Sequence, residues 1–326
     1  MGLQPGLILS AEARKIGAMQ VCVGDLSFEV EDLGEPSAPP LLLIMGLGAQ
    51  LLHWPDAFCE LLLARGLRVI RFDNRDIGLS SGLTQRGVPR VKGLIARAAL
   101  GLPREAPYRI QDMARDALGV LDALGIERAH VVGASMGGMI AQQLAIDAPH
   151  RVLSLTSLFS SPRAINFSKP RAIRALLSPA LSTREGAIQR SMDVFNALRG
   201  PRFPFDEALH LELATRVFDR APPILGGPAR QLSAIMASPR RDAGLRQLRV
   251  PTLVLHGTAD PLIPVSAGRL TARLIPQARL HLIEGMGHHL PPGAWEELRD
   301  QIVDHARRNT PAVHGAKPKG VRAAAS

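Results

Sequence analysis

The chain has 326 residues, of which 46% are hydrophobic and 21% charged, values that are ordinary for one large globular domain or a domain with an insert. No apolar run approaches the roughly 18 residues that a membrane helix needs, and Cys22 and Cys59 alone make no disulfide framework or four-cysteine zinc site. The formal charge of +10 does not indicate nucleic-acid binding, because half of it comes from five basic residues after position 306 and the rest lies among acids without an aromatic stacking stripe.

Residues 1–20 are expected to form an N-terminal extension. This segment lacks the basic stretch of a secretory signal, which, together with the low cysteine content, predicts a cytoplasmic location. Apolar runs, which predict buried strands, lie at 39–46, 67–73, 129–135, 152–159, 251–257 and 278–285. Helical patterns such as residues 108–126 separate these runs. The alternation predicts an α/β fold: a mostly parallel sheet with helices on both faces.

Two segments interrupt this alternation. Residues 83–107 are basic and contain several prolines and glycines, so they form a longer connection than a plain strand-to-helix unit requires. Residues 160–245 contain no convincing strand and predict three or four helices, including "TREGAIQRSMDVFNALRG" and "FDEALHLELATRVFDRA". We expect residues 21–159 and 246–307 to form the α/β core and residues 160–245 a helical cap. Residues 308–326 are expected to be a disordered basic tail.

The sequence "HVVGASMGG" places Ser135 where a predicted strand gives way to a predicted helix. Gly133 and Gly137 flank this serine in the pattern G-x-S-x-G. A serine at so sharp a turn adopts a strained backbone conformation, and side chains two residues away on either side would collide. The turn would hold the hydroxyl above the sheet, at the N-terminus of the following helix, as a nucleophile.

A serine nucleophile needs a base, and candidate partners follow the last two predicted strands. Asp260 comes after the strand at 251–257, and His288 and His289 come after the strand at 278–285. All three lie at the strand ends where Ser135 projects, so they can converge on it. We favour His288 as the base over His289, which is then a rim residue, and Asp260 as the acid that orients the imidazole.

An oxyanion formed at Ser135 needs two backbone donors. The N–H of Met136 is one candidate. The second should come from the loop "IMGLGAQLLHWP" after the first apolar run, where we assign it to Leu47, with Gly48 as the alternative. The substrate pocket is assigned to Gly46, Gly48, His53, Trp54 and His289. Packing at the start of a helix is the alternative for Trp54.

The stretch "RFDNRDIGLSSG" at 71–82 has a structural interpretation. We expect this stretch to brace the serine turn, with Asp73 and Arg75 in a buried or half-buried polar network.

Over roughly residues 22–307 the chain resembles the α/β-hydrolase fold family, and within it most closely the serine carboxylesterases of the aclacinomycin methylesterase type. The segments that carry the resemblance are "IMGLG", "FDNRDIGLS", "GASMGG", "GTADPLIP" and "GMGH", in family order. Two positions depart from the family pattern: Met45-Gly46 stands for a common His-Gly, and Arg75-Asp76 for a common Arg-Gly. The resemblance implies a Ser135–His288–Asp260 triad.

These observations predict a serine hydrolase that cleaves small carboxylic esters through an acyl-enzyme on Ser135. Its partner would be the ester substrate alone, without cofactor, metal, nucleic acid or membrane span, while the oligomeric state is left open. Lactone hydrolysis, carbon–carbon cleavage and acyl transfer to an alcohol remain as alternatives on the same triad. A non-catalytic ligand-binding protein with this fold is a further alternative.

Overall fold

A computed structural model describes residues 15–100, 102, 104–164, 169–176, 178 and 183–311. Within these residues the strands form one sheet in the order β1-β2-β4-β3-β5-β6-β7-β8. The strands are β1 Lys15–Val23, β2 Leu26–Leu33, β3 Pro40–Ile44, β4 Arg68–Phe72, β5 Ala129–Ala134, β6 Val152–Leu158, β7 Thr252–Gly257 and β8 Arg279–Ile283. Strands β3 to β8 run parallel to one another, and β1 and β2 pair antiparallel at one edge.

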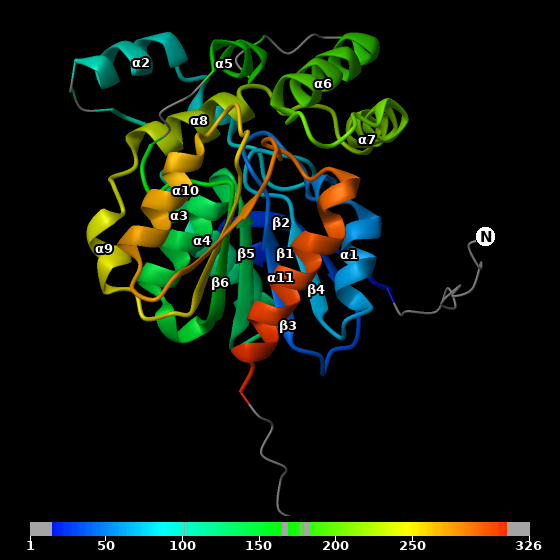
Figure 1. Cartoon of the computed structure of the whole chain (residues 1–326). Coiled ribbons are helices and arrows are strands. Elements are labelled where there is room, and N and C mark those ends of the chain that lie inside the picture. The colour runs from blue at the N-terminus through cyan, green and yellow to red at the C-terminus, as the bar shows by residue number, and fades with distance from the viewer. Residues whose placement is uncertain are drawn as a thin grey trace, which may run out of the picture.

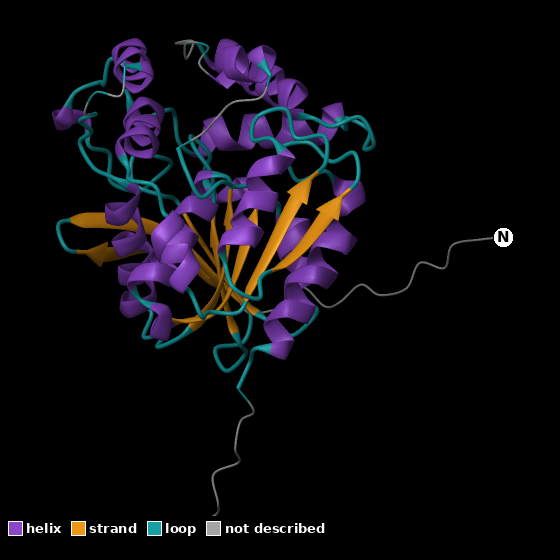
Figure 2. Ribbon diagram, turned by 60° about the vertical axis from the view of Figure 1, so that its left-hand side comes forward, coloured by secondary structure: helices purple, strands orange, loops and turns teal. Residues whose placement is uncertain are grey.

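The helices cover both faces of this sheet and its upper edge (Figure 1). They are α1 Asp56–Leu63, α2 Val91–Ala99, α3 Ile110–Ala123, α4 Met136–Asp147, α5 Pro170–Leu176, α6 Arg184–Leu198, α7 Glu207–Arg220, α8 Gly227–Ala237, α9 Asp242–Gln247, α10 Val265–Leu274 and α11 Trp295–Arg308. Helices α3, α4, α9 and α10 lie on one face, and α1 and α11 on the other, so the sheet is enclosed between two helical layers (Figure 2).

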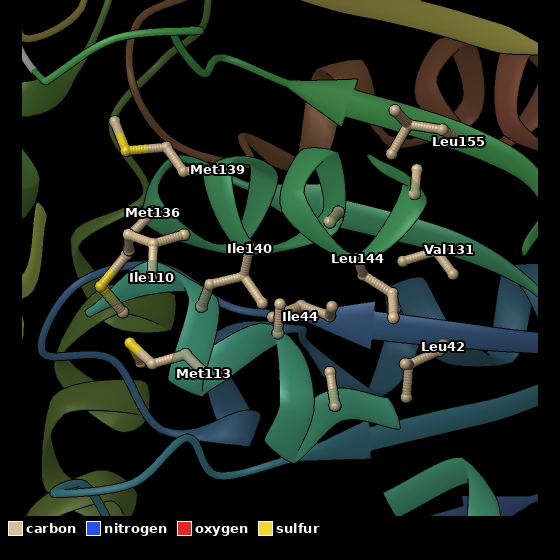
Figure 3. Close-up of a cluster of buried hydrophobic side chains, with 14 of the residues drawn as sticks. Leu42, Ile44, Ile110, Met113, Val131, Met136, Met139, Ile140, Leu144 and Leu155 are labelled. Carbon is tan, nitrogen blue, oxygen red and sulfur yellow. The ribbon is translucent and has the colours of Figure 1, made fainter. Parts of the chain in front are cut away.

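Strand β3 shows why the parallel strands appear in the sequence as continuous apolar runs. Leu42 and Ile44 pack under Ile140 of α4 in the larger hydrophobic cluster (Figure 3). Leu41 and Leu43 point the other way, into the cluster that α1 and α11 cover. All four side chains are almost fully buried, and each such burial is worth about 1.5–3 kcal/mol. Both faces of the strand therefore require apolar residues.

The six predicted strands are present as β3 to β8, each within two residues of its predicted ends. The predicted N-terminal extension, residues 1–20, is wrong in its second part. Residues 15–20 belong to β1, which pairs with β2 through a two-residue turn at Gly24 and Asp25. Strand β1 mixes polar and apolar residues, so it gives no continuous apolar run. Residues 1–14 lie outside the described part of the chain.

Helices α5, α6 and α7 lie above the carboxyl edge of the parallel strands, together with α2 and α8 (Figure 1). Helices α6 and α7 agree with the two helices that the sequence predicts in this region. The expected cap boundary at residue 245 falls inside α9, which packs against α4 and α10 beside the sheet. Helix α8 joins cap and core, because its Ala234 and Ile235 belong to the hydrophobic cluster under α3 and α4.

Helix α11 ends at Arg308, and the predicted basic tail lies outside the described residues from position 312 onward. Among the helices described, none is both long and apolar enough to cross a membrane.

Candidate active site

The turn between β5 and α4 holds Ser135 in a conformation that few residues other than glycine adopt. Its φ is 58° and its ψ is −119°, and such strain costs about 1–3 kcal/mol. A Cβ at Gly133 would lie 2.2 Å from the carbonyl oxygen of Gly137, and a Cβ at Gly137 would lie 2.0 Å from that of Ile44. The steric requirement for both glycines of the G-x-S-x-G pattern is therefore confirmed.

Hydrogen bonds from the neighbouring strand β6 hold this strained turn. The Ser135 N–H donates to the carbonyl oxygen of Leu158 over 2.9 Å. The hydroxyl of Ser160, just beyond β6, donates to the carbonyl oxygen of Ser135 over 2.6 Å. Sequence reasoning missed Ser160, because its partner is a backbone atom that leaves no pattern in the sequence.

Ser135, His288 and Asp260 meet at the carboxyl edge of the sheet. The Ser135 Oγ lies 2.9 Å from His288 Nε2, and His288 Nδ1 lies 2.7 Å from Asp260 Oδ2. A carboxylate only accepts hydrogen bonds, so Nδ1 carries the proton that Asp260 accepts, and Nε2 is free to accept the serine proton. All three side chains are buried or nearly so. The structure thus brings together the three residues that the sequence singled out.

Asp260 is held in place by its own loop. Its Oδ1 accepts the N–H groups of Leu262 and Ile263, each over 2.8 Å. The fully buried His256 donates from Nε2 to the carbonyl oxygen of Ile263 over 3.0 Å and lies 3.5 Å from Asp260 Oδ2. His256 is thus a buried packing residue, as expected. These contacts leave Oδ2 aimed at His288 in the free protein.

The adjacent histidines point in different directions. His288 is oriented by Asp260, and its ring centroid lies 4.7 Å from that of Phe159. His289 instead faces His210 of α7, with 6.3 Å between the ring centroids. Burial, followed by the proximity of His210, lowers the pKa of His289 to about 4. Of the two histidines, only His288 contacts Ser135.

The loop after β3 lies against Ser135. A Cβ added at Gly46 would come within 3.1 Å of the Ser135 Cβ, so the backbone passes close to the hydroxyl. In the described part of the chain, the N–H groups of Leu47 and Met136 have no hydrogen-bond partner. The Gly48 N–H, the alternative donor, is bound to Gln231 Oε1 over 2.8 Å. Leu47 and Met136 therefore remain the available pair.

A family model for the alpha/beta hydrolase fold matches residues 39–292, more than half of the chain. The chain belongs to the alpha/beta hydrolase fold family. Its mostly parallel sheet with helices on both faces agrees with the fold that the sequence predicts.

Several known proteins are similar to this hydrolase. Rhodomycin D methylesterase DnrP of Streptomyces peucetius is 33% identical over 300 residues, covering 86% of this chain and 95% of the relative. Rhodomycin D methylesterase DauP of Streptomyces sp. strain C5 is 34% identical over 307 residues, with the same coverage. Among solved structures, the enol-lactonase from Burkholderia xenovorans LB400 superposes with a TM-score of 0.66 at 24% identity, covering 89% of this chain and all of the other, a likeness of fold.

Rings of the cap meet rings of the hydrolase core beside His288. The ring cluster consists of His53, Phe195, Phe205, His210 and His289. The ring centroid of His210 lies 4.8 Å from that of Phe195 and 4.5 Å from that of Phe205. The centroids of Phe195 and His53 are 6.0 Å apart. Burial lowers the pKa of His53 to about 4. His53 and His289 thus present uncharged rings toward the cap at neutral pH.

Trp54 does not belong to this ring cluster, and its predicted place in the substrate pocket is wrong. Its side chain is fully buried in the hydrophobic cluster under α1 and α11. The indole stacks on Phe58 with 6.2 Å between ring centroids. The alternative expectation, that Trp54 packs the start of a helix, agrees with this position.

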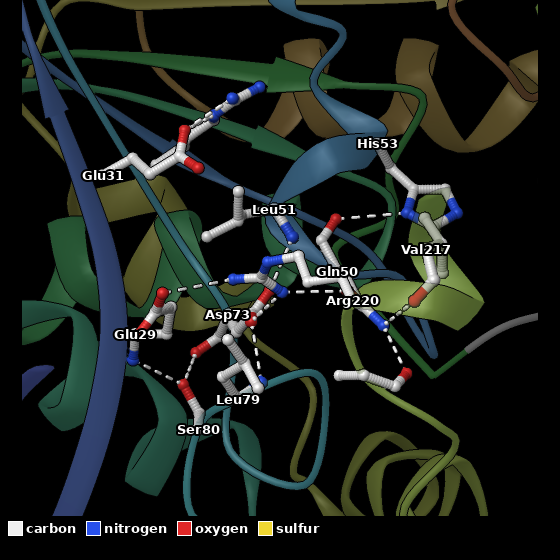
Figure 4. Close-up of polar contacts among 12 residues, drawn as sticks. Glu29, Glu31, Gln50, Leu51, His53, Asp73, Leu79, Ser80, Val217 and Arg220 are labelled. Atoms are coloured by element: carbon white, nitrogen blue, oxygen red, sulfur yellow. Dashed lines mark hydrogen bonds and ion pairs between the residues drawn. The ribbon is translucent and has the colours of Figure 1, made fainter. Parts of the chain in front are cut away.

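A buried polar network connects the loop after β4 with the loop after β3 and with α7 (Figure 4). The Asp73 carboxylate accepts the N–H of Leu51 over 2.7 Å, the N–H of Leu79 over 3.0 Å and a guanidinium N–H of Arg220 over 2.7 Å. Gln50 donates to two backbone carbonyls at the end of α7, those of Val217 and Ala221. The network expected at Asp73 is present, but the Arg75 side chain is not part of it, because it pairs with Asp116. The network includes instead a cap residue, Arg220, that sequence reasoning missed.

Arg75 and Asp76 anchor the same loop to helices. Arg75 forms a bidentate pair with Asp116 of α3, at 2.6 Å for both contacts. Asp76, which replaces the family's common glycine, has a φ of 69°, a left-handed conformation that glycine adopts more easily. Its carboxylate accepts two hydrogen bonds from Arg230 of α8, over 2.9 and 2.7 Å, and one from the Tyr108 hydroxyl over 2.7 Å. The departure from the family pattern therefore creates a tether to α8.

We expect Arg230→Met to destabilise the protein strongly. Both partners of the Arg230–Asp76 pair are fully buried, and removing one partner of such a pair costs about 3–5 kcal/mol because the other charge is left uncompensated. Urea unfolding would measure the loss as a lower midpoint at an unchanged slope.

The matched control is Arg184→Met, which removes a bidentate pair with Asp219 that is about half exposed. Solvent screens such a pair, so the urea midpoint of Arg184→Met should stay close to that of the parent. Equal midpoints for the two variants would contradict a stabilising tether at Arg230.

Proposed function

We propose that this chain is a serine hydrolase that cleaves small carboxylic esters through an acyl-enzyme on Ser135. The observation that carries the proposal is the hydrogen-bonded series from Ser135 Oγ to His288 Nε2 and from His288 Nδ1 to Asp260, at the strained turn before α4. The two rhodomycin D methylesterase relatives support ester hydrolysis over lactone hydrolysis, carbon–carbon cleavage, acyl transfer and binding without catalysis.

Acylation begins when neutral His288 accepts the Ser135 proton at Nε2. Ser135 Oγ then forms a bond to the ester carbonyl carbon, whose oxygen becomes an oxyanion. We assign the two donors for that oxyanion to the N–H groups of Leu47 and Met136, at the N-terminus of α4. His288 next gives its proton to the leaving alcohol oxygen as the carbon–oxygen bond of the ester breaks.

Deacylation repeats these steps with water. His288 takes a proton from water, and the hydroxide oxygen adds to the acyl carbon. The second tetrahedral oxyanion collapses, the bond from carbon to Ser135 Oγ breaks, and the serine regains its proton from His288. The products are a carboxylic acid and the free enzyme. Asp260 stabilises the imidazolium that forms in each half-reaction and keeps its Nε2 toward Ser135.

We further propose that the ring cluster lines the substrate pocket together with Gly46 and Gly48. Its position supports this assignment, because His289 follows the proposed base directly and His53 follows the oxyanion loop. A cytoplasmic location is also proposed, since Cys22 and Cys59 are both free thiols.

An ester panel that varies acyl length and leaving group tests the proposed activity, with methyl esters of aromatic acids among its members. Covalent labelling with a fluorophosphonate, followed by peptide mapping, tests the nucleophile. The expected result is ester turnover with the label on the peptide that contains Ser135. An absence of turnover across the panel, with no label on that peptide, would overturn the proposal.

Asp260→Asn should lower kcat by about 10⁴-fold, the loss typical of a triad acid whose charge and tautomer control are removed. Shape is retained, so KM and the melting temperature should change little. Parent kcat should rise with pH, because the general base must be uncharged to accept the Ser135 proton. The lowered pKa values of His53 and His289, about 4, keep those two rings neutral over the pH range measured.

The measurement is kcat between pH 5 and 10 with a melting curve at each pH. A melting curve is needed because the pKa of His53 and of His289 in the folded protein lies near 4, below the unfolded value of about 6.5. Between pH 6.5 and pH 4 the unfolded chain therefore binds more protons than the folded protein. The free energy of unfolding falls as the pH is lowered through this range. Activity of Asp260→Asn within a few-fold of the parent, with a normal melt, would place the acid elsewhere.

A further inference from the structure

Helix α8 of the cap reaches the oxyanion loop through one side chain. Gln231 is fully buried, and both ends of its amide are used. Its Oε1 accepts the N–H of Gly48 over 2.8 Å, and its Nε2 donates to the carbonyl oxygen of Arg75 over 2.8 Å. One end meets a donor and the other an acceptor, so only one orientation of the amide satisfies both loops.

Hydrogen bonds within and beside the loop occupy the two backbone N–H groups that follow Leu47. Gly46 accepts the N–H of Ala49 over 3.4 Å, which closes a tight turn. The N–H of Gly48 is bound by Gln231. Of the three successive donors at 47, 48 and 49, only Leu47 has no partner in the described structure. Gly46 itself lies against Ser135, so the turn is fixed at one end by the nucleophile and at the other by Gln231.

The helix that carries Gln231 has a fixed position. The preceding residue, Arg230, is bound to Asp76 by the buried ion pair described above. A Cβ at Gly227, the first residue of α8, would lie 2.2 Å from the Asp76 carbonyl oxygen, so the helix start packs directly on the loop after β4. Gln231 therefore extends from a rigid support, as a group that positions catalytic atoms must.

We propose that Gln231 is a positioning residue: it binds Gly48 so that the neighbouring Leu47 N–H stays aimed at the oxyanion, and it thereby makes the cap part of the oxyanion hole. The inference rests on the proposed ester hydrolysis at Ser135. A neutral amide suits this role, because a carboxylate in its place would put negative charge near the developing oxyanion.

The test replaces Gln231 by Met, which keeps the side-chain length but removes both hydrogen bonds. Loss of a whole oxyanion donor costs about 10²–10³-fold in kcat, so a displaced donor should cost about 10–100-fold. KM should stay within a few-fold, and the pH profile should keep its midpoint, because His288 is untouched. Affinity for a trifluoromethyl ketone, which forms a tetrahedral adduct on the serine, should fall in parallel with kcat.

The matched control is Gln142→Met. Gln142 is another fully buried glutamine with two side-chain hydrogen bonds, to Ser157 over 3.0 Å and from Arg241 over 3.2 Å. It should lose thermal stability to a similar extent and keep the parent kcat. A second variant, Gln231→Asn, keeps a buried amide but is one methylene too short to bridge both loops, so it should fold and show an intermediate loss of kcat.

The outcomes separate the two proposals. If the parent hydrolyses esters and is labelled at Ser135, the proposed function stands whatever Gln231 does. A folded Gln231→Met or Gln231→Asn with kcat within two-fold of the parent would then overturn the positioning role. The positioning role would also be overturned if Gln231→Met lost no more kcat than Gln142→Met, or if both Gln231 variants failed to fold. Either result would assign Gln231 a purely structural role.

Discussion

Ser135→Ala is expected to abolish ester turnover and fluorophosphonate labelling while leaving the fold intact. The substitution removes only Oγ, whose interaction is with His288 Nε2 at 2.9 Å, so no core contact is lost. Removal of a triad nucleophile costs about 10⁶-fold in kcat, and the residual rate comes from substrate binding and the oxyanion donors. The measurements are p-nitrophenyl acetate turnover, labelling, and a melting curve that should match the parent's.

The matched control is Ser157→Ala, on the neighbouring strand β6. Ser157 is also buried, and its Oγ accepts one hydrogen bond, from Gln142 over 3.0 Å. This variant should retain the parent kcat and labelling. Turnover by Ser135→Ala at the parent rate, with a normal melt, would end the serine-hydrolase proposal.

The parallel part of the sheet could be predicted because burial on both faces leaves a local signal. Leu41 to Ile44 are apolar without interruption, since alternate residues enter different hydrophobic clusters. Strand β1 gives no such signal, because it lies at the edge of the sheet and, of its side chains that the structure describes, only that of Val21 is buried. Its pairing with β2 depends on a turn at Gly24 and Asp25 that the apolar pattern does not reveal.

The candidate triad could be predicted because each member follows a strand with a local pattern, and parallel strands end at one edge. The residues that hold these side chains in position could not be predicted from the sequence. Gln231 lies 183 positions from Gly48, and Arg220 lies 147 positions from Asp73, so only the fold places them together. The position of Trp54 could not be predicted for the same reason. Its neighbours in sequence allow both a pocket and a core position, and only the fold, which stacks it on Phe58, decides between them.

His288→Ala should reduce kcat about 10⁶-fold, as removal of a triad base does, whereas His289→Ala should retain most of the activity. The two residues are adjacent in sequence, yet their rings have different partners. His288 bridges Ser135 and Asp260. His289 faces His210 of α7, and its Nδ1 is buried without a hydrogen-bond partner in the described structure.

The pH profile separates a general base from a residue that only shapes the site. His289→Ala should show the parent's rise of kcat with pH, because the ring it removes has a pKa of about 4 and is neutral over the range measured. A change in KM across an ester panel, with kcat and its pH midpoint preserved, is the result expected if His289 lines the pocket. His288→Ala should instead lose the rise of kcat with pH, leaving only the slow attack of an unassisted Ser135. If His289→Ala were the inactive variant and His288→Ala kept a normal profile, the base would have to be reassigned, together with the aim of Asp260 that the 2.7 Å hydrogen bond to His288 now defines.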